Sequence, residues 1–324
     1  MKQIAVSVPG KLMLMGEHAV IYGRPCIVTA IDQRIITTAE LLEESIFKLE
    51  APDVKVTGYQ KTTADLGKGE IPKEAKFAEL AVLNFLNAYK ISKGIKIITK
   101  SPFSANFGFG SSAGTVVGII KSLSELFSVT VSQKELFDLS YKTVLDVQGK
   151  GSGFDVAAAI YGGTIFFQNK GEVIESLTAD GLNLVIGYCG VKADTVSMIN
   201  SVESKMKNYK AGIDKIFDNI GGLVIEAKSA ILEKDWERLG TLMDYNQNYL
   251  EDLAVSTEKL NNMIEGAKKS GAYGTKLSGA GGGDCMVALV SEEKKLKVTQ
   301  AIEVVGGQVI NVTPNAPGVK VENI

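Results

Sequence analysis

Phe107-Gly108-Phe109-Gly110-Ser111-Ser112-Ala113-Gly114-Thr115 is the stretch that decides the fold. It follows a strand-like run at 95–99 and leads into an apolar helix at about 113–127. Small residues at a strand-to-helix junction let backbone N–H groups approach an anion, and the helix N-terminus adds roughly half a positive charge. The stretch therefore predicts a phosphate-binding loop.

Other glycine-loop families fit this stretch less well. Gly108-x-Gly110-x-x-Ala113 matches a relaxed dinucleotide fingerprint, but that motif belongs on the first strand of a βαβ unit. Here a second helix follows, and Ser132 and Glu135 form its capping box. The Gly-x-x-x-x-Gly-Lys-Ser/Thr P-loop and the protein-kinase motifs are both missing from the sequence.

The bulk composition limits the class of protein. A length of 324 residues favours two domains, and 45% hydrophobic with 22% charged residues is typical of a soluble globular protein. The net charge of −2 gives no reason to expect nucleic acid, and no apolar run reaches the roughly 18 residues of a membrane span. Three scattered cysteines and one histidine argue against a His/Cys metal site and indicate a cytoplasmic protein.

The order of elements predicts a mixed α and β architecture with a domain boundary near residue 180. A first strand at 4–8 is expected to end at Pro9-Gly10. The remaining predictions are strands at 26–31, 34–41, 182–188, 286–290 and 308–313, a loop or hairpin at 52–74, and helices at 77–88, 132–147, 198–208, 212–233, 235–249, 256–270 and 292–304.

Two further glycine-rich segments, at 149–153 and 278–283, indicate a ligand with several anionic groups. Phosphoryl transfer has that need, because its catalysis is mostly positioning and charge stabilisation. In this interpretation Ser111 or Ser112 helps to hold Mg²⁺ and phosphate oxygens, Asp155 accepts the proton of the attacking hydroxyl, and Lys11 offsets the charges. The alternative for Asp155 is an N-cap of the helix that begins at Val156.

Three segments together resemble the motifs of the GHMP small-molecule kinases. These are Pro9-Gly10-Lys11 with Gly16-Glu17-His18-Ala19-Val20 (the first motif), the 107–115 stretch, and Ser278-Gly279-Ala280-Gly281-Gly282-Gly283 (the third motif). The resemblance implies an α+β two-domain GHMP kinase fold. Its ATP-binding domain at 1–180 would be ribosomal protein S5 domain 2-like, and its C-terminal domain at 181–324 ferredoxin-like.

The branch of the family is marked by conflicting signals. Gly16 to Gly23, Asp244 to Leu250 and Leu253 to Ser256 look like mevalonate kinases. Gly151 to Ala157, and the Gly283-Asp284-Cys285 ending, are instead similar to phosphomevalonate kinases.

The resemblance also assigns residues. Asp155 matches the catalytic aspartate, and Lys11 the lysine beside it. Matches to the ATP-phosphate loop are Asn106, Gly108, Phe109, Gly110, Ser111, Ser112, Ala113, Gly114 and Thr115. Matches to substrate-side positions are Glu17, His18, Ser152, Thr195 and Gly281. Ser112 matches the Mg²⁺-binding serine.

The sequence departs from the family pattern at two functional positions. Val144 stands at the position where the family usually carries a Mg²⁺-binding glutamate. Asp146 lies on a different face of the helix, so it could replace that glutamate only if the helix ended early. Ser104 stands where the family usually has a proline, just before the phosphate-binding loop. We expect an ATP- and Mg²⁺-dependent kinase that phosphorylates the 5-hydroxyl of mevalonate. The alternatives are a phosphomevalonate kinase and a non-catalytic metabolite-binding protein; a homodimer is left open.

Overall fold

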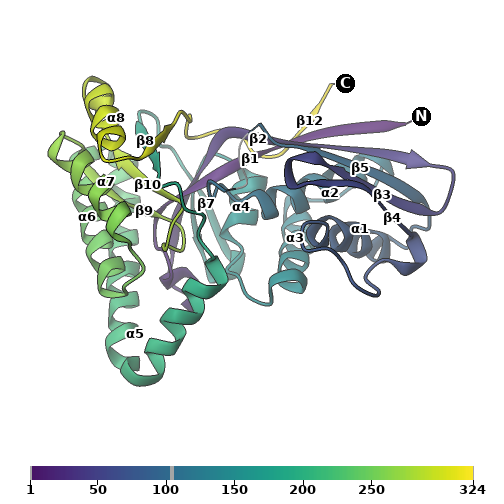
Figure 1. Ribbon diagram of the computed structural model, residues 1–324, viewed down its shortest axis with the longest axis horizontal. Helices are drawn as coiled ribbons and strands as arrows, with labels where there is room; N and C mark the ends of the chain where they lie inside the picture. Colours follow the sequence, from purple (N-terminus) through teal and green to yellow (C-terminus); the bar gives the residue numbers. More distant parts are fainter. Residues whose placement is uncertain (1, 103–105, 324) are drawn as a thin grey trace.

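The computed structural model describes residues 2–102 and 106–323, which form two lobes (Figure 1). The first lobe contains a large sheet with the strand order β12-β1-β2-β5-β3-β4, and β6 and β7 extend it from β2. Its strands are β1 (Gln3–Met15), β2 (Cys26–Leu42), β3 (Ile46–Ala51), β4 (Val56–Thr62), β5 (Gly94–Lys100), β6 (Thr164–Gln168), β7 (Val173–Leu177) and β12 (Lys320–Glu322). The helices of this lobe are α1 (Lys76–Tyr89), α2 (Ser111–Leu126), α3 (Gln133–Gln148) and α4 (Phe154–Tyr161).

The second lobe is an antiparallel sheet with the order β11-β8-β10-β9, covered by helices. Its elements are β8 (Leu184–Tyr188), α5 (Thr195–Glu233), α6 (Trp236–Asp252), α7 (Glu258–Lys269), β9 (Gly274–Ser278), β10 (Cys285–Leu289), α8 (Lys295–Val304) and β11 (Gln308–Ile310). With α5, α6 and α7 counted as one helical insertion, the connectivity is the βαββαβ pattern of ferredoxin-like folds. The predicted α+β architecture is confirmed.

Strand β1 carries the feature that places the site. Its pairing register with β2 shifts between Pro9 and Gly10, so the strand contains an irregularity where one was expected to end. Before the shift Val6 and Val8 belong to the core under α1–α4, whereas after it Leu12 and Leu14 belong to the core shared with the second lobe. At the shift Asp32 and Gln33 of β2 have no partner in β1, and such an irregularity can change the face on which later side chains lie. Lys11 is thereby turned toward α2 and α4.

Some expected element boundaries were wrong; the strand expected at 308–313, for example, ends at Ile310. The first strand runs on to Met15, because a proline is tolerated where the ladder shifts. The strands expected at 26–31 and 34–41 are one strand, β2, whose first part pairs with β6 and whose last part pairs with β5. The helices expected at 198–208 and 212–233 are one helix, α5, kinked at Tyr209.

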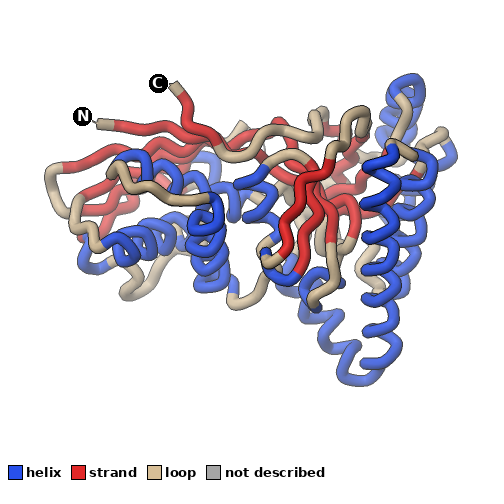
Figure 2. The backbone as a smooth tube through the Cα atoms, turned by 180° about the vertical axis from the view of Figure 1, so that it is seen from behind, coloured by secondary structure: helices blue, strands red, loops and turns tan. Residues whose placement is uncertain are grey.

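The segment at 52–74 is ordered as part of a hairpin rather than an open loop. Strand β4 pairs with β3, and the buried carboxylate of Glu79 on α1 accepts hydrogen bonds from Lys61 Nζ at 2.9 Å and from the Gly67 N–H at 2.7 Å. These bonds hold the hairpin against α1. In the tube view the helices of the first lobe lie beneath its sheet, and the two chain ends lie side by side (Figure 2).

The last residues of the chain return to the first lobe. Strand β12 pairs with β1, and Pro314 and Pro317 form isolated bridges with Ile31 and Gly162. The strands up to β7, which ends at Leu177, belong to the first sheet, those from β8 to β11 belong to the second, and β12 returns to the first. Within the described residues, no helix combines the length and the apolar character that crossing a membrane requires.

Candidate active site

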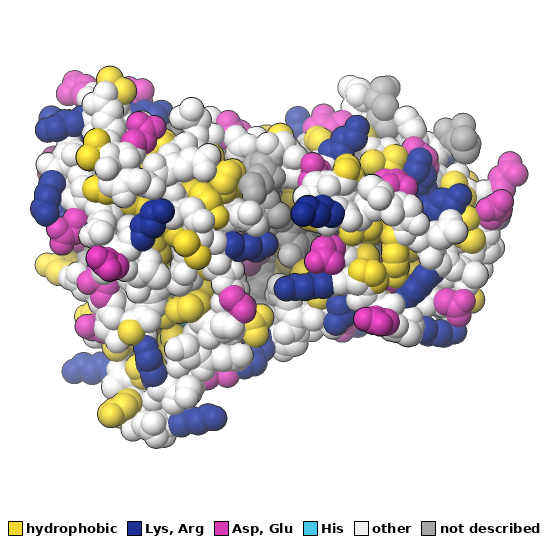
Figure 3. Space-filling model, viewed as in Figure 1, with side chains coloured by type: hydrophobic (Ala, Val, Ile, Leu, Met, Phe, Trp, Pro, Cys, Tyr) yellow, Lys and Arg dark blue, Asp and Glu magenta, His cyan; other side chains and the backbone are white. Residues whose placement is uncertain are grey.

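A single cavity of about 490 Å³ lies between the lobes and collects most of the predicted residues. It is lined by β1, the turn after it, the start of α2, the 150–156 segment, the start of α5 and the third motif. Figure 3 shows the molecule hollowed between the two lobes, with lysine or arginine side chains beside the hollow. The volume is in the range of small-molecule sites.

The 106–115 segment, which we call the phosphate loop, ends in the first turn of α2. Gly110 occupies the N-cap with φ 81°, and Gly108 has φ 72°. A Cβ on Gly108 would lie 2.5 Å from Asp284 Oδ2, so only glycine fits there without displacing a neighbour. The first N–H groups of a helix have no intrahelical partner. Ser111 and Ser112 stand in this turn and line the cavity.

Lys11 and Asp155 meet at the phosphate loop. Lys11 Nζ lies 3.1 Å from Asp155 Oδ1 and donates to the Gly108 carbonyl at 3.1 Å, while the Lys11 N–H donates to the Phe109 carbonyl at 3.0 Å. Asp155 lies in the first turn of α4, and the N-cap there is Gly153 without a side-chain bond, so the capping alternative for Asp155 is wrong. Its Oδ1 forms an ion pair but no well-aligned hydrogen bond within the described residues, which leaves an acceptor position unused.

Glu17, His18, Ser152 and Thr195 all line the cavity, as the resemblance implied. His18 has a left-handed backbone with φ 60°, and its Nε2 lies 2.9 Å from the Ala280 carbonyl of the third motif. Since a carbonyl only accepts, Nε2 carries the proton. Burial lowers the pKa of His18, and the ring is therefore neutral near pH 7.

Val144 and Asp146 are placed differently from each other. Helix α3 continues to Gln148, so the condition under which Asp146 could replace the missing glutamate is not met. Val144 is 8% exposed and lines the cavity, whereas Asp146 lies outside the cavity lining. Asp146 accepts hydrogen bonds from Lys142 Nζ at 2.6 Å and from Asn84 Nδ2 at 2.9 Å. Asp146 is thus part of a surface ion pair on α3.

Some other predicted residues lie away from the cavity lining. Gly114 packs on β2, where a Cβ would lie 3.0 Å from Ile35 Cδ1, and Gly281 packs on the turn after α6, where a Cβ would lie 2.1 Å from the Val255 carbonyl. The close backbone approach requires glycine at position 281, whereas a side chain at position 114 would meet only the tip of Ile35. Asn106 is exposed at the start of the phosphate loop. Ser104 lies outside the described residues.

Asp284 is a cavity residue whose position the sequence did not reveal. Its Oδ1 accepts from the Ala193 N–H at 2.8 Å, and its own N–H donates to the Val191 carbonyl at 2.8 Å. Burial raises the pKa of this carboxyl group. Asp284 therefore ties the third motif to the segment that precedes Thr195, next to Gly108. Asp284 has a left-handed backbone with φ 58°, which cannot be inferred from the spacing of residues in the sequence.

One part of the cavity lining comes from the first lobe and combines apolar side chains with Asp53, Lys73, Glu74 and Lys100. Its apolar side chains include Leu49 and Ala51 of β3, Val54, and Phe77 and Ala78 of α1. The alternation of Phe47, Leu49 and Ala51 marks a buried strand face in the sequence. It does not reveal that Leu49 and Ala51 border a cavity.

Comparison with known proteins places this site in a family. Residues 76–163 match the family described as GHMP kinases N terminal domain, and residues 227–305 match GHMP kinases C terminal. The chain is 37% identical to the mevalonate kinase of Pyrococcus furiosus over 100% of its length and 99% of the relative's.

Two solved structures are similar over almost the whole chain. The Methanococcus jannaschii mevalonate kinase is 27% identical with a TM-score of 0.82, covering 97% of this chain and 98% of that one. The L. major mevalonate kinase in complex with R-mevalonate is 25% identical with a TM-score of 0.79, covering 96% and 95%. The chain belongs to the GHMP kinase family, on the branch of the mevalonate kinases.

Proposed function

We propose that this chain transfers the γ-phosphoryl group of ATP to the 5-hydroxyl of mevalonate. The observation that carries the proposal is the meeting of Asp155 and Lys11 with the phosphate loop inside one cavity. The family gives the reaction type, and the full-length relatives named mevalonate kinase favour mevalonate as the acceptor, by which we mean the molecule that receives the phosphoryl group.

Asp155 is the residue that we assign to proton transfer. As the acceptor hydroxyl attacks, its proton passes to the Asp155 carboxylate, while its oxygen forms the new bond to phosphorus. Asp155 lies in the first turn of α4, at the positive end of the helix dipole. Lys11 balances the carboxylate and lies between it and the phosphate loop, where negative charge develops in the transition state.

The residues at the start of α2 fit a bound triphosphate. The first backbone N–H groups of a helix have no intrahelical partner, and the Ser111 and Ser112 hydroxyls form no hydrogen bond within the described residues. ATP bound there would supply the phosphoryl group. Ser112 would hold Mg²⁺ together with phosphate oxygens, and Mg²⁺ would neutralise phosphate charge.

The first-lobe part of the cavity lining suits the base of the nucleotide. Phe77 and Val54 offer flat and aliphatic surface, and Lys73 and Lys100 line the same part. Apolar walls with a few polar groups are usual for such ligands. If the base of ATP lies against this part and its phosphates at the start of α2, the acceptor binds on the opposite side, beside Glu17, His18, Ser152 and Thr195.

The alternatives from the sequence are less well supported. Phosphomevalonate as acceptor rested on the 151–157 segment and on the Asp284 ending, yet the full-length relatives are mevalonate kinases. A phosphate acceptor would need further cations nearby, for which Arg24, Lys150 and Lys192 are candidates. Arg24 is bound to Asp218 outside the cavity lining, whereas Lys150 and Lys192 line the cavity and Lys150 is paired with Glu203. A non-catalytic binding protein has no need for a buried lysine beside a carboxylate that keeps an unused acceptor position.

We further infer a cytoplasmic protein, supported by three cysteines that are all unpaired and buried. The acceptor is tested by a coupled ADP-release assay with Mg-ATP and, separately, mevalonate, phosphomevalonate and galactose. Turnover of mevalonate is expected. Turnover of phosphomevalonate alone, or of none of the three, contradicts the proposal.

A further inference from the structure

Lys276 of β9 and Glu17 of the turn after β1 form an ion pair whose two side chains are both 0% exposed. Lys276 Nζ contacts Glu17 Oε1 and also donates to the Leu277 carbonyl. Glu17 lines the cavity, whereas Lys276 lies behind it, outside the cavity lining. The pair therefore joins the wall of the site to the core of the second lobe.

Stability alone is a poor reason for such a pair. Taking two charges out of water costs several kcal/mol for each ion, and an apolar replacement of similar volume is often neutral or stabilising. The cost is increased because Glu17 Oε2 has no hydrogen-bond partner within the described residues. The backbone N–H groups of Glu17 and Gly279 also face this carboxylate. Oε2 still forms no well-aligned hydrogen bond within the described residues, so it keeps an acceptor position in the cavity wall.

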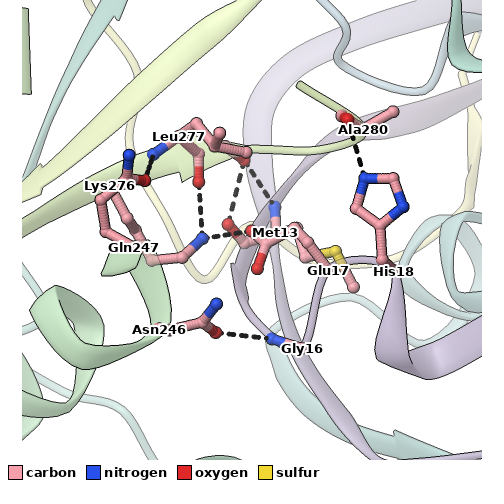
Figure 4. A network of polar contacts seen from close by, with 10 residues as sticks. Met13, Gly16, Glu17, His18, Asn246, Gln247, Lys276, Leu277 and Ala280 are labelled. Carbon is pink, nitrogen blue, oxygen red and sulfur yellow. Dashed lines mark hydrogen bonds and ion pairs between the residues drawn. The ribbon is translucent and has the colours of Figure 1, made fainter. Parts of the chain in front are cut away.

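The surrounding backbone holds the pair in place (Figure 4). The Gly16 N–H donates to Asn246 Oδ1 at 3.1 Å, and the Leu277 N–H donates to Gln247 Oε1 at 3.0 Å. Ser278 Oγ bonds both the N–H and the carbonyl of Met13 at 3.0 Å. Strand β1 is thus bonded directly to β9, and the turn at Gly16 and strand β9 are each bonded to α6. These bonds fix the backbone on both sides of the pair.

We propose that Lys276 is a positioning residue that holds Glu17 ionised and oriented, with Oε2 presented to a hydroxyl group of the acceptor. The inference rests on the proposed function and deepens it. Lys276 touches neither ligand. It acts through Glu17 Oε1, which it occupies, so that Oε2 is the oxygen left for the acceptor.

The charges around Glu17 give this role a pH signature. Lys276 faces it from β9, the Cys26 thiol faces it from β2, and the neutral His18 follows it in the turn. Burial raises the pKa of Glu17, while the attraction and hydrogen bond of Lys276, followed by the backbone N–H groups of Glu17 and Gly279, lower it. Without Lys276 the raising effect is unopposed by a cation, and Glu17 becomes protonated nearer to neutral pH.

The test compares Lys276→Met, Glu17→Gln and the double variant, with whichever acceptor the wild-type protein turns over. In Lys276→Met we expect the acceptor KM at pH 7 to rise roughly ten- to hundredfold, the effect of losing a hydrogen bond to a charged group. The KM for ATP should stay within about twofold. The acceptor kcat/KM of this variant should increase with pH between about 6 and 9, and that of wild type should not.

The other variants separate positioning from folding. Glu17→Gln should lose acceptor affinity without the pH dependence, and adding Lys276→Met to it should cause little further loss. Lys61→Met is the matched control, because Lys61 pairs with the equally buried Glu79 away from the acceptor end. It should lower the melting temperature but leave the acceptor KM unchanged.

An acceptor KM in Lys276→Met that is unchanged, or raised equally at every pH, overturns the inference. If Lys276→Met does not fold, Lys276→Gln is measured in the same way with the same criteria. A wild-type protein that does not use mevalonate contradicts the proposed function instead, and the variants then test Lys276 with the acceptor that it does use.

Discussion

Lys11 Nζ lies 3.1 Å from Asp155 Oδ1 and joins strand β1 to the first turn of α4. The two residues are brought together by the register shift at Pro9 and Gly10, which turns Lys11 to the face of the sheet where α2 and α4 pack. The same lysine donates to the Gly108 carbonyl of the phosphate loop. The base, its balancing charge and the anion-binding helix therefore meet beside the register shift between β1 and β2.

Asp155→Asn should lower kcat by about 10²- to 10⁴-fold, because an amide cannot take the proton of the attacking hydroxyl. The KM for ATP should change little, since Asp155 lies beside rather than in the phosphate loop. Steady-state kinetics measure both. Asp146→Asn, on the surface of α3, is the control and should behave as wild type. A near-normal kcat in Asp155→Asn removes Asp155 from the role of base.

Val144→Glu should restore a carboxylate at the position where related kinases carry one. Val144 lines the cavity, so we expect half-maximal activity at a Mg²⁺ concentration several-fold lower than in wild type. Val144→Gln has nearly the same shape without the charge and should leave the Mg²⁺ titration unchanged. Equal titrations for the two variants would show that this position does not reach the metal. Asp146→Ala should also titrate like wild type.

Gly108→Ala should raise the KM for ATP about tenfold or more, because its Cβ would meet Asp284 and force the phosphate loop to move. Gly58→Ala provides the control: Gly58 also has a left-handed φ, of 67°, but its Cβ would meet nothing within 4 Å. Both variants should lose some stability in thermal unfolding. Only Gly108→Ala should lose affinity for ATP. A similar ATP affinity in both variants would show that the close approach of Gly108 to Asp284 does not shape the phosphate loop for ATP.

His18 gives the folded protein a specific sensitivity to acid. Burial lowers the pKa of His18 below its ordinary value of 6.5, so the unfolded chain binds a proton more readily than the folded one. The free energy of unfolding therefore falls as pH decreases below 6.5, by at most about 1.4 kcal/mol per pH unit from this group.

His18→Asn should remove this part of the acid sensitivity, and asparagine tolerates the left-handed backbone. Urea unfolding of both proteins between about pH 7 and 5 measures it. The difference in unfolding free energy between them should shrink as the pH falls. Parallel curves would mean that His18 takes up protons equally in both states.

Local sequence features were enough to predict the elements around the phosphate loop. The strand, loop and helix around residues 107–127 were readable from small residues and periodicity, and the capping box of Ser132 and Glu135 is present as expected. The pairing of Lys11 with Asp155 came from the resemblance to a family, because nothing local links residues so far apart.

What the sequence could not reveal depends on long-range contacts. Glu17 and Lys276 are 259 positions apart, and neither has a neighbour in the chain that predicts a buried partner. Pro9 and Gly10 read as a strand end because the same residues serve both to stop a strand and to shift its register. The continuity of α5 through Tyr209 was missed since a kink within a helix looks like a break in periodicity.

The central claim is that a hydroxyl group, rather than a phosphate, receives the phosphoryl group. Phosphorus NMR of the product formed from mevalonate and Mg-ATP tests it most directly. The account predicts a new phosphate monoester on the 5-oxygen, with ADP formed in equal amount and no further phosphorylation of that product. A diphosphate formed from phosphomevalonate, with mevalonate left unchanged, would contradict it.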